Sequence, residues 1–462
     1  MKEQVKQIHF VGIGGVGMAG IAEVCLNLGY VVSGSDLKHN PTVARLESLG
    51  ALIQLGHDAN HVKNTDVVVV STAIAAGNQE VDWAKAARVP VIPRAEMLAE
   101  LMRMRFGIAI AGTHGKTTTT SLAAAVLTQG GIDPTFVIGG KLNQVGSNAR
   151  LGSSQYLVAE ADESDASFLH LSPMMSVVTN IDEDHMGTYQ GDYQNLENTF
   201  IEFIHRLPFY GMAIMCIDDE NIQKILPKLS RKILTYGFSE MADVRAINVQ
   251  ANALSMQFQV LVGRELSFDV TLNTPGRHNV LNALAAISIG LELDVSIEAI
   301  QQALTEFGGV GRRFEVYPNR MVASHNVTLV DDYGHHPTEL EATISTAKEA
   351  FPNKRLVLVF QPHRYSRTRD LFDDFVQALL GPDLVILMDV YAAGETPLPM
   401  FDSKALLQAL RIRGGNGFYA DSFEQLNEIA GDVLQNDDVL LVMGAGDVGQ
   451  VSKNWQVEEE QA

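Results

Sequence analysis

The residues Gly112-Thr-His-Gly-Lys-Thr-Thr118 have the types and the order of a loop that binds the phosphates of a nucleotide. They follow an apolar run, Gly107–Ala111, and precede a run that we expect to form a helix, Thr117–Leu127. Backbone N–H groups at such a helix N-terminus can donate hydrogen bonds to phosphate oxygens. The Lys116 ammonium would add positive charge, and the Thr117 hydroxyl suits Mg²⁺ as a ligand. The sequence therefore predicts a site for a nucleoside triphosphate.

This loop is shorter than the usual P-loop pattern, because the position five before Gly115 is Ile110 rather than glycine. The alternative interpretation is a glycine-containing turn that binds no ligand. The position of the loop between a predicted strand and a predicted helix favours the nucleotide site.

Two acidic runs follow predicted strands at positions where a metal ion would be needed. Glu160-Ala-Asp-Glu-Ser-Asp165 follows Tyr156–Ala159, and Asn180-Ile-Asp-Glu-Asp-His185 follows Ser176–Thr179. Because ligands gather at the carboxyl ends of parallel strands, we expect both runs to lie beside the phosphate loop. Their carboxylate oxygens predict a Mg²⁺ site, with a solvated acidic surface as the alternative. His185 is an ambiguous ligand, because Mg²⁺ prefers oxygen.

A second glycine loop, Gly12-Ile-Gly-Gly-Val-Gly17, lies near the N-terminus. With Asp36 nineteen positions after Gly17, it matches the dinucleotide-binding pattern of Rossmann folds. The same glycine spacing recurs at Gly444–Gly449, but only thirteen residues follow it, so we interpret that copy as a strand-to-helix turn. The first loop is a candidate diphosphate site whose nucleotide the pattern leaves open.

A third block combines histidines and arginines. Asp331-Asp-Tyr-Gly-His-His-Pro-Thr-Glu339 and Pro362-His-Arg-Tyr-Ser-Arg-Thr-Arg369 each follow a β-prone run. Three arginines fall within six positions of the second run: Arg364, Arg367 and Arg369. Arginine suits bidentate recognition of carboxylate or phosphate, and a surface cluster with ion-pair partners is the alternative. The residues alone leave His335 and His336 open as capping or packing residues.

Short apolar runs alternate with helical segments along the whole chain, which indicates open α/β sheets. The pattern of strand, glycine turn and helix starts near Ile8, again near Gly107 and again near Val327. The 462 residues suit about three domains at ~150 residues each. We therefore predict three consecutive α/β domains, residues 1–93, 94–311 and 312–462, with joints near Val91–Arg94 and Gly308–Arg312.

The composition limits the class of protein. With 46% hydrophobic and 19% charged residues, the chain can bury several cores, which excludes wholesale disorder. The net charge of −21 argues against a nucleic-acid-binding surface, but not against a locally bound anion. The two cysteines, Cys25 and Cys216, are too few for a disulfide framework, and we expect both to be buried thiols.

The chain shows no signal for a membrane or for export. No apolar run approaches the ~18–20 residues that cross a bilayer. The first residues carry charges and enter the glycine loop, unlike a signal peptide. We therefore expect a cytoplasmic protein without membrane insertion, and we expect its acidic end, Glu458–Ala462, to be frayed.

Together these residues resemble the Mur ligase family, in order and over essentially the whole chain. The motifs that carry the resemblance are Gly12–Gly17, Gly34-Ser-Asp36, Gly112–Thr118, Glu160–Asp165, Asn180–His185, Gly276-Arg-His-Asn279, Gly311-Arg-Arg-Phe314, Asp331–Glu339 and Pro362–Asp370. The resemblance implies an N-terminal Rossmann-like UDP-binding domain, a central P-loop ATPase domain and a C-terminal Rossmann-like domain that closes over both.

The resemblance also implies a reaction, the first peptide step of peptidoglycan precursor synthesis. An ATP-dependent ligase would join L-alanine to the lactyl carboxylate of UDP-N-acetylmuramate, through an acyl phosphate and a tetrahedral intermediate. Ligases of the same family that recycle murein tripeptide are the alternative, since they share the phosphate loop and the Asp-Asp-aromatic-x-His-His-Pro-Thr block. The run Pro362–Asp370, together with Tyr333, favours the L-alanine-adding members.

Two alternatives from other classes remain open. A nicotinamide-dependent oxidoreductase would explain Gly12–Gly17 and Asp36, but it would leave the Lys116 loop without a role. A regulatory nucleotide-binding protein would explain both loops but not the arginine block. We expect a monomer or a weak homodimer.

The resemblance assigns roles to single residues. Lys116, Glu160 and His185 would be catalytic, and Thr117, Glu160 and His185 would hold Mg²⁺. The ATP site would comprise Gly112, Thr113, His114, Gly115, Lys116, Thr117, Thr118, His278, Asn279, Asn282, Arg312 and Asp332. Within it, His278, Asn279 and Asn282 would lie by the adenine, Arg312 by the phosphates and Asp332 near the ribose. The UDP-sugar would contact Gly14, Gly15, Asp36, His57 and Ser71. The site for L-alanine and the reacting carboxylate would comprise Tyr333, His335, Arg364 and Arg367. Several Mur ligases carry a carbamylated lysine after the metal-binding histidine; Tyr193–Phe200 has no lysine, so a second Mg²⁺ would be held without one.

Overall fold

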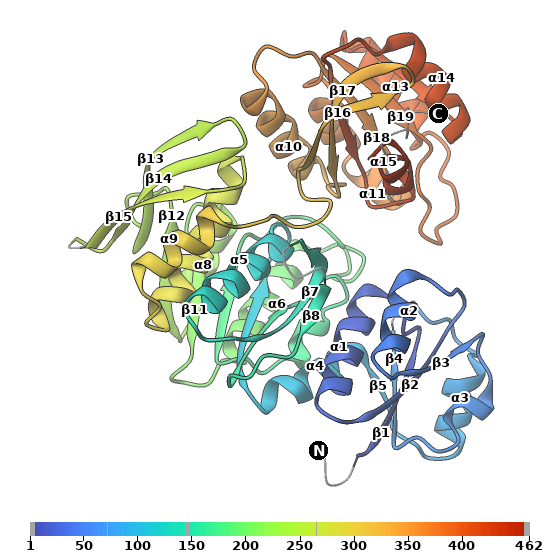
Figure 1. The fold of residues 1–462 in the computed structure, drawn as a ribbon, viewed down its shortest axis with the longest axis vertical. Coiled ribbons are helices and arrows are strands. Elements are labelled where there is room, and N and C mark those ends of the chain that lie inside the picture. The colour runs from blue at the N-terminus through green and yellow to red at the C-terminus, as the bar shows by residue number, and fades with distance from the viewer. Residues whose placement is uncertain (1–4, 72, 144–146, 265, 457–462) are drawn as a thin grey trace. The chain divides into compact units, whose positions relative to one another are not determined.

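The computed structural model describes residues 5–71, 73–143, 147–264 and 266–456, which leaves the predicted frayed end Glu458–Ala462 outside the described residues. The chain forms two compact units. One comprises Met1–Ile247, Gln259–Val270 and Leu281–Gly308, and the other comprises Asn248–Phe258, Thr271–Val280 and Gly309–Ala462. Its strands form three sheets with helices packed around them, which confirms the predicted α/β class (Figure 1).

The first sheet is parallel and has the strand order β3-β2-β1-β4-β5. Its strands are β1 (Gln7–Val11), β2 (Val31–Asp36), β3 (Leu52–Leu55), β4 (Val67–Val70) and β5 (Val91–Pro93). The helices of this region are α1 (Val16–Asn27), α2 (Pro41–Ser48), the 3₁₀ helix η1 (Ala59–Val62), α3 (Gln79–Ala86) and α4 (Arg94–Arg103). The chain returns to the other side of β1 when it forms β4, so the carboxyl ends of β1, β2 and β4 flank a topological switch point, where α/β proteins bind ligands.

The second sheet has ten strands in the order β15-β14-β13-β12-β11-β10-β6-β9-β7-β8. They are β6 (Phe106–Ala111), β7 (Thr135–Leu142), β8 (Ser147–Arg150), β9 (Tyr156–Glu160), β10 (Met175–Val178), β11 (Met212–Cys216), β12 (Lys232–Gly237), β13 (Val244–Asn252), β14 (Ser255–Val262) and β15 (Leu266–Leu272). The helices are α5 (Lys116–Gln129), η2 (Ser167–His170), α6 (Tyr193–His205), α7 (Glu220–Ile225), η3 (Leu226–Lys228), α8 (Arg277–Glu292) and α9 (Ile297–Thr305). The central strand β6 pairs in parallel with β9 and β10, so the phosphate loop and both acidic runs leave the sheet at one edge.

The third sheet has the order β16-β17-β21-β18-β19-β20, and only its β16–β17 pair is antiparallel. Its strands are β16 (Glu315–Val322), β17 (His325–Asp332), β18 (Leu356–Phe360), β19 (Leu384–Met388), β20 (Gly417–Ala420) and β21 (Val439–Met443). The helices are α10 (Pro337–Ala350), α11 (Tyr365–Asp370), α12 (Phe372–Leu379), α13 (Ser403–Ile412), α14 (Phe423–Val433) and α15 (Val448–Gln456). Along β18, Leu356, Leu358 and Phe360 belong to one buried cluster, and Val357 and Val359 belong to another. Both faces of this sheet are therefore covered.

Several details differ from the sequence-based expectation or extend it. The predicted joint Val91–Arg94 is an ordered step in which β5 leads directly into α4. The strands β13 to β15 were not predicted; exposed and buried positions alternate along β14, as in a strand buried on one face. The second glycine copy, Gly444–Gly449, connects β21 to α15, which confirms the predicted strand-to-helix turn. Cys25 and Cys216 are buried free thiols, as expected. Among the described residues, no helix is both long and apolar enough to cross a membrane.

Candidate active site

The loop between β6 and α5 has the backbone geometry of a phosphate site. Gly112 and Gly115 have φ angles of +124° and +82°, in the range that favours glycine. A Cβ atom on Gly112 would lie 2.1 Å from Thr179 Oγ1, and one on Gly115 would lie 2.5 Å from Asn282 Oδ1. Gly115 precedes the first residue of α5 and offers no side-chain cap. The first N–H groups of α5 can therefore donate to phosphate oxygens.

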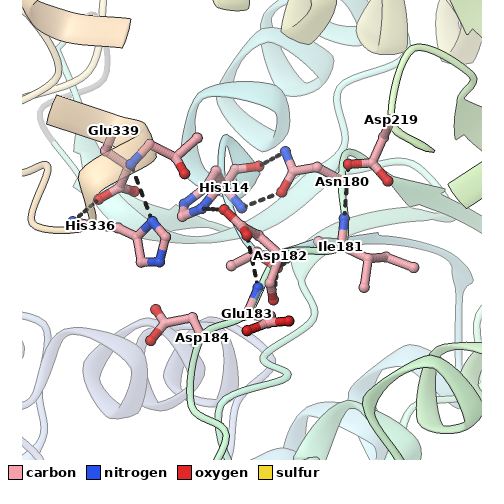
Figure 2. Close-up of polar contacts among 12 residues, drawn as sticks. His114, Asn180, Ile181, Asp182, Glu183, Asp184, Asp219, His336 and Glu339 are labelled. Carbon is pink, nitrogen blue, oxygen red and sulfur yellow. Dashed lines mark hydrogen bonds and ion pairs between the residues drawn. The ribbon is translucent and has the colours of Figure 1, made fainter. Parts of the chain in front are cut away.

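The acidic run after β10 holds the shape of this loop, as Figure 2 shows. The Asn180 side chain accepts from the His114 N–H at 2.8 Å and donates to the His114 carbonyl at 3.0 Å. The Asp182 carboxylate lies 3.0 Å from His114 Nε2, and the Asp182 N–H donates to the Thr113 hydroxyl at 2.8 Å. These contacts fix the peptide units that a phosphate group would meet.

Lys116 lies in the loop with its charge already paired. Its Nζ donates to Glu163 Oε1 at 2.8 Å and to the carbonyl oxygens of Gly112 and Thr113 at 2.6 and 3.0 Å. Burial acts to lower the pKa of Lys116, but attraction to Glu163 outweighs it and raises that pKa. Burial raises the pKa of Glu163 to about 7, against the opposing charge of Lys116. A triphosphate in the loop would therefore compete with Glu163 for the lysine.

Oxygen ligands surround this lysine. Thr117 is buried in the first turn of α5, and Glu160 ends β9, where it accepts from the Gly139 N–H at 2.6 Å. The negative charge of Glu160 contributes to the raised pKa of Lys116. Glu163 Oε2 is buried and has no hydrogen-bond partner among the described residues. A hydroxyl and carboxylates are the donors that Mg²⁺ prefers, so the residues present fit such an ion.

His185 lies in the same acidic run but has a local partner. It has a φ of +54°, its N–H donates to Asp184 Oδ1 at 2.8 Å, and its Nε2 lies 3.4 Å from Asp184 Oδ2. A carboxylate that orients an imidazole in this way is common beside metal ligands. The role of His185 as a ligand stays a prediction.

The first glycine loop is bound to the end of β2. The N–H groups of Gly12 and Ile13 donate to the Ser35 carbonyl at 2.9 and 3.0 Å. The Gly14 N–H donates to Asp36 Oδ2 at 2.8 Å, and a Cβ atom on Gly14 would lie 2.8 Å from the same oxygen. Asp36 therefore stabilises the conformation of the loop, whether or not it also contacts a ligand.

The other residues predicted for the UDP-sugar lie at the same edge of the first sheet. The Gly15 N–H donates to the Gly12 carbonyl at 3.2 Å. Ser71 Cβ lies 3.9 Å from the position of a Cβ on Gly12. His57 Nδ1 lies 2.9 Å from Ser35 Oγ. The structure thus brings Gly14, Gly15, Asp36, His57 and Ser71 to the carboxyl ends of neighbouring strands.

The second unit holds Arg312 against the turn that follows β21. Arg312 Nη2 donates to the Gly444 carbonyl at 2.7 Å, and its Nε lies 3.3 Å from Asp331 Oδ1. The guanidinium also lies over the ring of Tyr333, 5.3 Å from its centre. A Cβ atom on Gly449 would lie 2.6 Å from Arg312 Cζ. Because Gly449 has no side chain, the guanidinium of Arg312 can lie against this turn.

Asp332, predicted near the ribose, is buried and bonded within its own domain. It accepts from the Phe314 N–H at 2.8 Å and from the Gly334 N–H at 2.7 Å. Burial raises the pKa of Asp332 to about 6, although the charge of Arg313 opposes the shift. In this structure the carboxylate supports two turns of the backbone.

The three residues predicted for adenine all belong to α8 but have different surroundings. Burial lowers the pKa of His278 to about 4, and the Arg313 charge adds to the shift, so the imidazole is neutral at pH 7. Asn279 donates to the Pro275 carbonyl at 2.7 Å. Asn282 Oδ1 accepts from the Thr119 hydroxyl at 3.1 Å and lies against Gly115. Asn282 therefore borders the phosphate loop directly.

The arginine run begins in a strained conformation. Arg364 has a φ of +70° and a ψ of +134°, which is unusual for a residue with a side chain. Its N–H donates to the Tyr391 carbonyl at 2.8 Å, and its Nε is buried without a hydrogen-bond partner among the described residues. Arg369 is exposed and pairs with Asp370 at 2.7 Å, so for this arginine the surface alternative is correct. A strained arginine with a buried free N–H indicates a site for an anionic group.

A row of rings connects the other predicted residues of this block. Ring centres lie 5.6 Å apart for Tyr333 and His335, 5.4 Å for His335 and His363, and 5.5 Å for His363 and Tyr391. Arg367 is buried and donates to the His363 carbonyl at 3.2 Å. The structure therefore brings Tyr333, His335 and Arg367 together through His363, a member of the run Pro362–Arg369 that had no predicted role of its own.

His336 has the capping role that the sequence left open. It is buried, it precedes α10, and its Nδ1 accepts from the Thr338 N–H at 3.3 Å. Its own N–H donates to Glu339 Oε2 at 3.2 Å, so the two residues form a capping box (Figure 2). The capping box thus accounts for the Nδ1 atom and the backbone N–H of this histidine.

The structure adds residues that the sequence analysis did not single out. Asn180, Asp182 and Glu163 lay inside the predicted acidic runs, and a signal was present, since each run ends a buried strand beside the phosphate loop. His363 lay inside the predicted run Pro362–Arg369, although it had no predicted role of its own, and Glu80 had no such signal. Glu80 looks like an ordinary charged residue of an amphipathic helix.

Three family profiles match consecutive parts of the chain. They are described as the Mur ligase family catalytic domain, over residues 7–106, the Mur ligase middle domain, over residues 110–290, and the Mur ligase glutamate ligase domain, over residues 312–446.

Curated proteins and solved structures are similar over the same length. UDP-N-acetylmuramate–L-alanine ligase of Hydrogenovibrio crunogenus is 76% identical over 457 residues, 99% of each chain. The enzyme of the same name from Halorhodospira halophila is 56% identical over 96% of this chain and 92% of its own. The crystal structure of UDP-N-acetylmuramate–alanine ligase from Thermotoga maritima covers 97% of this chain and 98% of its own, with a TM-score of 0.82 at 28% identity. A murein peptide ligase from Psychrobacter arcticus covers 99% of both chains, with a TM-score of 0.72 at 25% identity.

Proposed function

The chain belongs to the Mur ligase family, and we propose that it joins L-alanine to the lactyl carboxylate of UDP-N-acetylmuramate in an ATP-dependent reaction. The observation that carries this proposal is 76% identity over nearly the whole chain to an enzyme named for that reaction. The recycling alternative is not favoured, because the curated relatives that match nearly the whole chain, at 76% and 56% identity, are named as L-alanine ligases.

The chemistry requires an activated carboxylate, because a free carboxylate is a poor electrophile for an amine. The lactyl carboxylate attacks the γ-phosphorus of ATP, so that a carboxyl oxygen–phosphorus bond forms and ADP leaves. The amine of L-alanine then attacks the carbonyl carbon, and inorganic phosphate leaves from the tetrahedral intermediate. An enzyme contributes to both steps chiefly by positioning and by stabilising charge.

The phosphate loop supplies that stabilisation for the first step. The N–H groups at the start of α5 would bind phosphate oxygens, while Lys116 exchanges Glu163 for the transferring group. Thr117, Glu160 and His185 would hold Mg²⁺, which when bound neutralises charge on the phosphates. Asn282 would contact the nucleotide beside Gly115.

The two other sites bind the partners of the reaction. The loop Gly12–Gly17, with Asp36, His57 and Ser71, would hold the UDP-sugar at the carboxyl edge of the first sheet. Arg364 and Arg367, with Tyr333 and His335, would bind the carboxylate of L-alanine or the reacting carboxyl group.

The remaining parts of the proposal concern the setting of the enzyme. We propose that it acts in the cytoplasm, where ATP and sugar nucleotides are substrates, and that it is a monomer or a weak homodimer. Sedimentation velocity at two protein concentrations tests the second statement. A stable tetramer at both concentrations would contradict it.

The reaction itself is tested by mixing the protein with Mg·ATP and UDP-N-acetylmuramate, with and without L-alanine. We expect phosphate release that depends on L-alanine, and a product whose mass equals the sugar nucleotide plus one alanine residue. Phosphate release that ignores both substrates would contradict the proposal and would favour the regulatory alternative.

A further inference from the structure

A buried carboxylate gathers polar side chains from several segments of the first domain. Glu80, near the start of α3, is fully buried. Its Oε2 accepts from the Ser35 hydroxyl at 2.6 Å and lies 3.0 Å from His57 Nδ1. Its Oε1 lies 2.7 Å from His61 Nδ1 and 3.6 Å from His9 Nε2. This polar cluster has no role in the reaction described above, apart from His57.

The cluster keeps Glu80 ionised. Burial acts to raise its pKa, but interactions with His9, Ser35 and His61 outweigh burial and lower the pKa to about 2. An ionised carboxylate can only accept hydrogen bonds. The ring nitrogens that face it, Nδ1 of His57 and Nδ1 of His61, must therefore carry hydrogen atoms.

This arrangement selects one tautomer of His57. With Nδ1 protonated towards Glu80, a neutral imidazole has its lone pair on Nε2. In the part of the chain that the structure describes, no protein group bonds to Nε2 of His57, and the side chain is 16% exposed. In its neutral form, His57 therefore offers a fixed acceptor to a ligand.

The same cluster is attached to the base of the first glycine loop. The Ser35 carbonyl accepts from Gly12 and Ile13 at 2.9 and 3.0 Å, while the Ser35 hydroxyl donates to Glu80. The next residue, Asp36, accepts from the Gly14 N–H. A shift of the Glu80 carboxylate would thus be transmitted both to the ring of His57 and to the strand end that supports the loop.

We propose that Glu80 is a positioning residue for the UDP-sugar: it fixes His57 with Nε2 outward, as an acceptor for an N–H or O–H group of that substrate. The inference rests on the proposed function, which places His57 at the UDP-sugar. His61 and Ser35 hold the carboxylate in place, so that it cannot rotate away from His57.

The test is the variant Glu80→Gln, which keeps the size of the side chain but replaces one acceptor oxygen by an NH₂ donor. We expect the KM for UDP-N-acetylmuramate to rise by ~10–100-fold, by analogy with metal-binding histidines that lose the carboxylate orienting them. We expect kcat and the KM values for ATP and L-alanine to change by less than about threefold, because only uniform binding of one substrate is lost. An unchanged KM for the UDP-sugar in a folded variant would overturn the proposal.

The matched control is Glu47→Gln, which changes another histidine–carboxylate pair of the same domain. Glu47 Oε2 lies 3.0 Å from His39 Nε2, but both side chains are exposed, at 41% and 50%. We expect all kinetic constants of this control to equal those of the wild type. An equal rise in KM for both variants would show a general effect of the lost charge and would overturn the positioning role.

A measurement on the unmodified protein covers the case in which Glu80→Gln does not fold. At a pH well above the ordinary imidazole pKa of about 6.5, ¹⁵N chemical shifts of labelled histidine distinguish the two tautomers. We expect the Nδ1–H form for His57, with Nε2 as the atom whose shift changes on addition of UDP-N-acetylmuramate. The Nε2–H form would overturn the proposal. A wild type that neither binds the UDP-sugar nor turns over would instead refute the proposed function, while the tautomer would still decide the role of Glu80.

Discussion

Replacement of Lys116 by alanine separates the two nucleotide sites of the enzyme. Lys116 is the cation of the phosphate loop, and among the described residues it donates hydrogen bonds to Glu163 and to two carbonyl oxygens of the same loop. None of them belongs to the first glycine loop. We therefore expect Lys116→Ala to abolish most of the turnover and to leave the affinity for UDP-N-acetylmuramate within about twofold of the wild type.

The size of the loss follows from the position of the charge. Lys116 is 18% exposed and Glu163 is 5% exposed, so little water screens the ammonium. Removal of one preorganised donor from such a site costs about 3–4 kcal/mol of transition-state stabilisation, a fall in kcat of ~10²–10³-fold. The variant also leaves Glu163 without its cation, which raises the pKa of that carboxyl further and favours its neutral form. Folding should therefore survive.

The assay is phosphate release under saturating substrates, combined with calorimetric titration of UDP-N-acetylmuramate. The matched control is Lys232→Ala, which removes an exposed lysine that pairs with Glu292 at 3.1 Å. We expect no change in turnover for the control, because exposed ion pairs contribute only about 0–1 kcal/mol and this one is distant from the loop in the sequence. Loss of UDP-sugar binding in a folded Lys116→Ala variant, or a kcat within tenfold of the wild type, would refute the reasoning.

Three further predictions concern other parts of the site. Gly115→Ala should lower the free energy of unfolding by about 1–3 kcal/mol and raise the KM for ATP, because φ is +82° and the new Cβ would meet Asn282; an unchanged melting temperature would contradict this. The raised pKa of Asp332, about 6 instead of 3.8, means that the folded state binds the proton more tightly, so this group should lower stability as the pH rises from about 4 to 6. Urea unfolding between about pH 4 and 6 should therefore show a smaller pH-dependent loss for Asp332→Asn than for the wild type, and equal slopes would argue against it. Arg364→Ala should raise the KM for L-alanine by ~10-fold or more, whereas Arg369→Ala, at the exposed end of the run, should not; equal effects of both changes would contradict the assignment.

Local patterns predicted the fold class and the strand–loop–helix arrangement around Gly112–Thr118 well, because both depend on residues close together in the sequence. The run Gly112–Thr118 contains its own turn, helix start and cation, and the strands on either side are short apolar segments. The turn at Gly444–Gly449 was recognised for the same reason. The contact between this turn and Arg312 was not predicted. Arg312 occupies the space that a side chain at Gly449 would fill, but it is far away in the sequence.

Contacts between residues far apart in the sequence could not be predicted from local patterns. Glu80 meets Ser35, His57 and His61 only in the folded domain, where β1 lies between β2 and β4, so no local spacing indicates the cluster. Burial also differs between residues of the same type that lie close together in the sequence. Arg367 is buried beside His363 while Arg369 is exposed, although only one residue lies between them.

The contacts of two acidic residues, Asp332 and Glu163, could not be predicted from the sequence either. The role of Asp332 at the ribose stays a prediction, and the structure adds that its carboxylate accepts two backbone N–H groups, which the sequence did not indicate. Glu163 was one acid among several in its run, and only the structure shows that it pairs with Lys116. A contact with a ligand depends on where a side chain points, and residue type does not determine that.

The central claim is that the enzyme adds L-alanine and not a preformed peptide. The most direct test compares kcat/KM for L-alanine with that for the tripeptide L-alanyl-γ-D-glutamyl-meso-diaminopimelate, with Mg·ATP and UDP-N-acetylmuramate present in both reactions. We expect turnover with L-alanine and none above background with the tripeptide. Turnover with the tripeptide alone would contradict the account and would identify the chain as a recycling ligase of the same family.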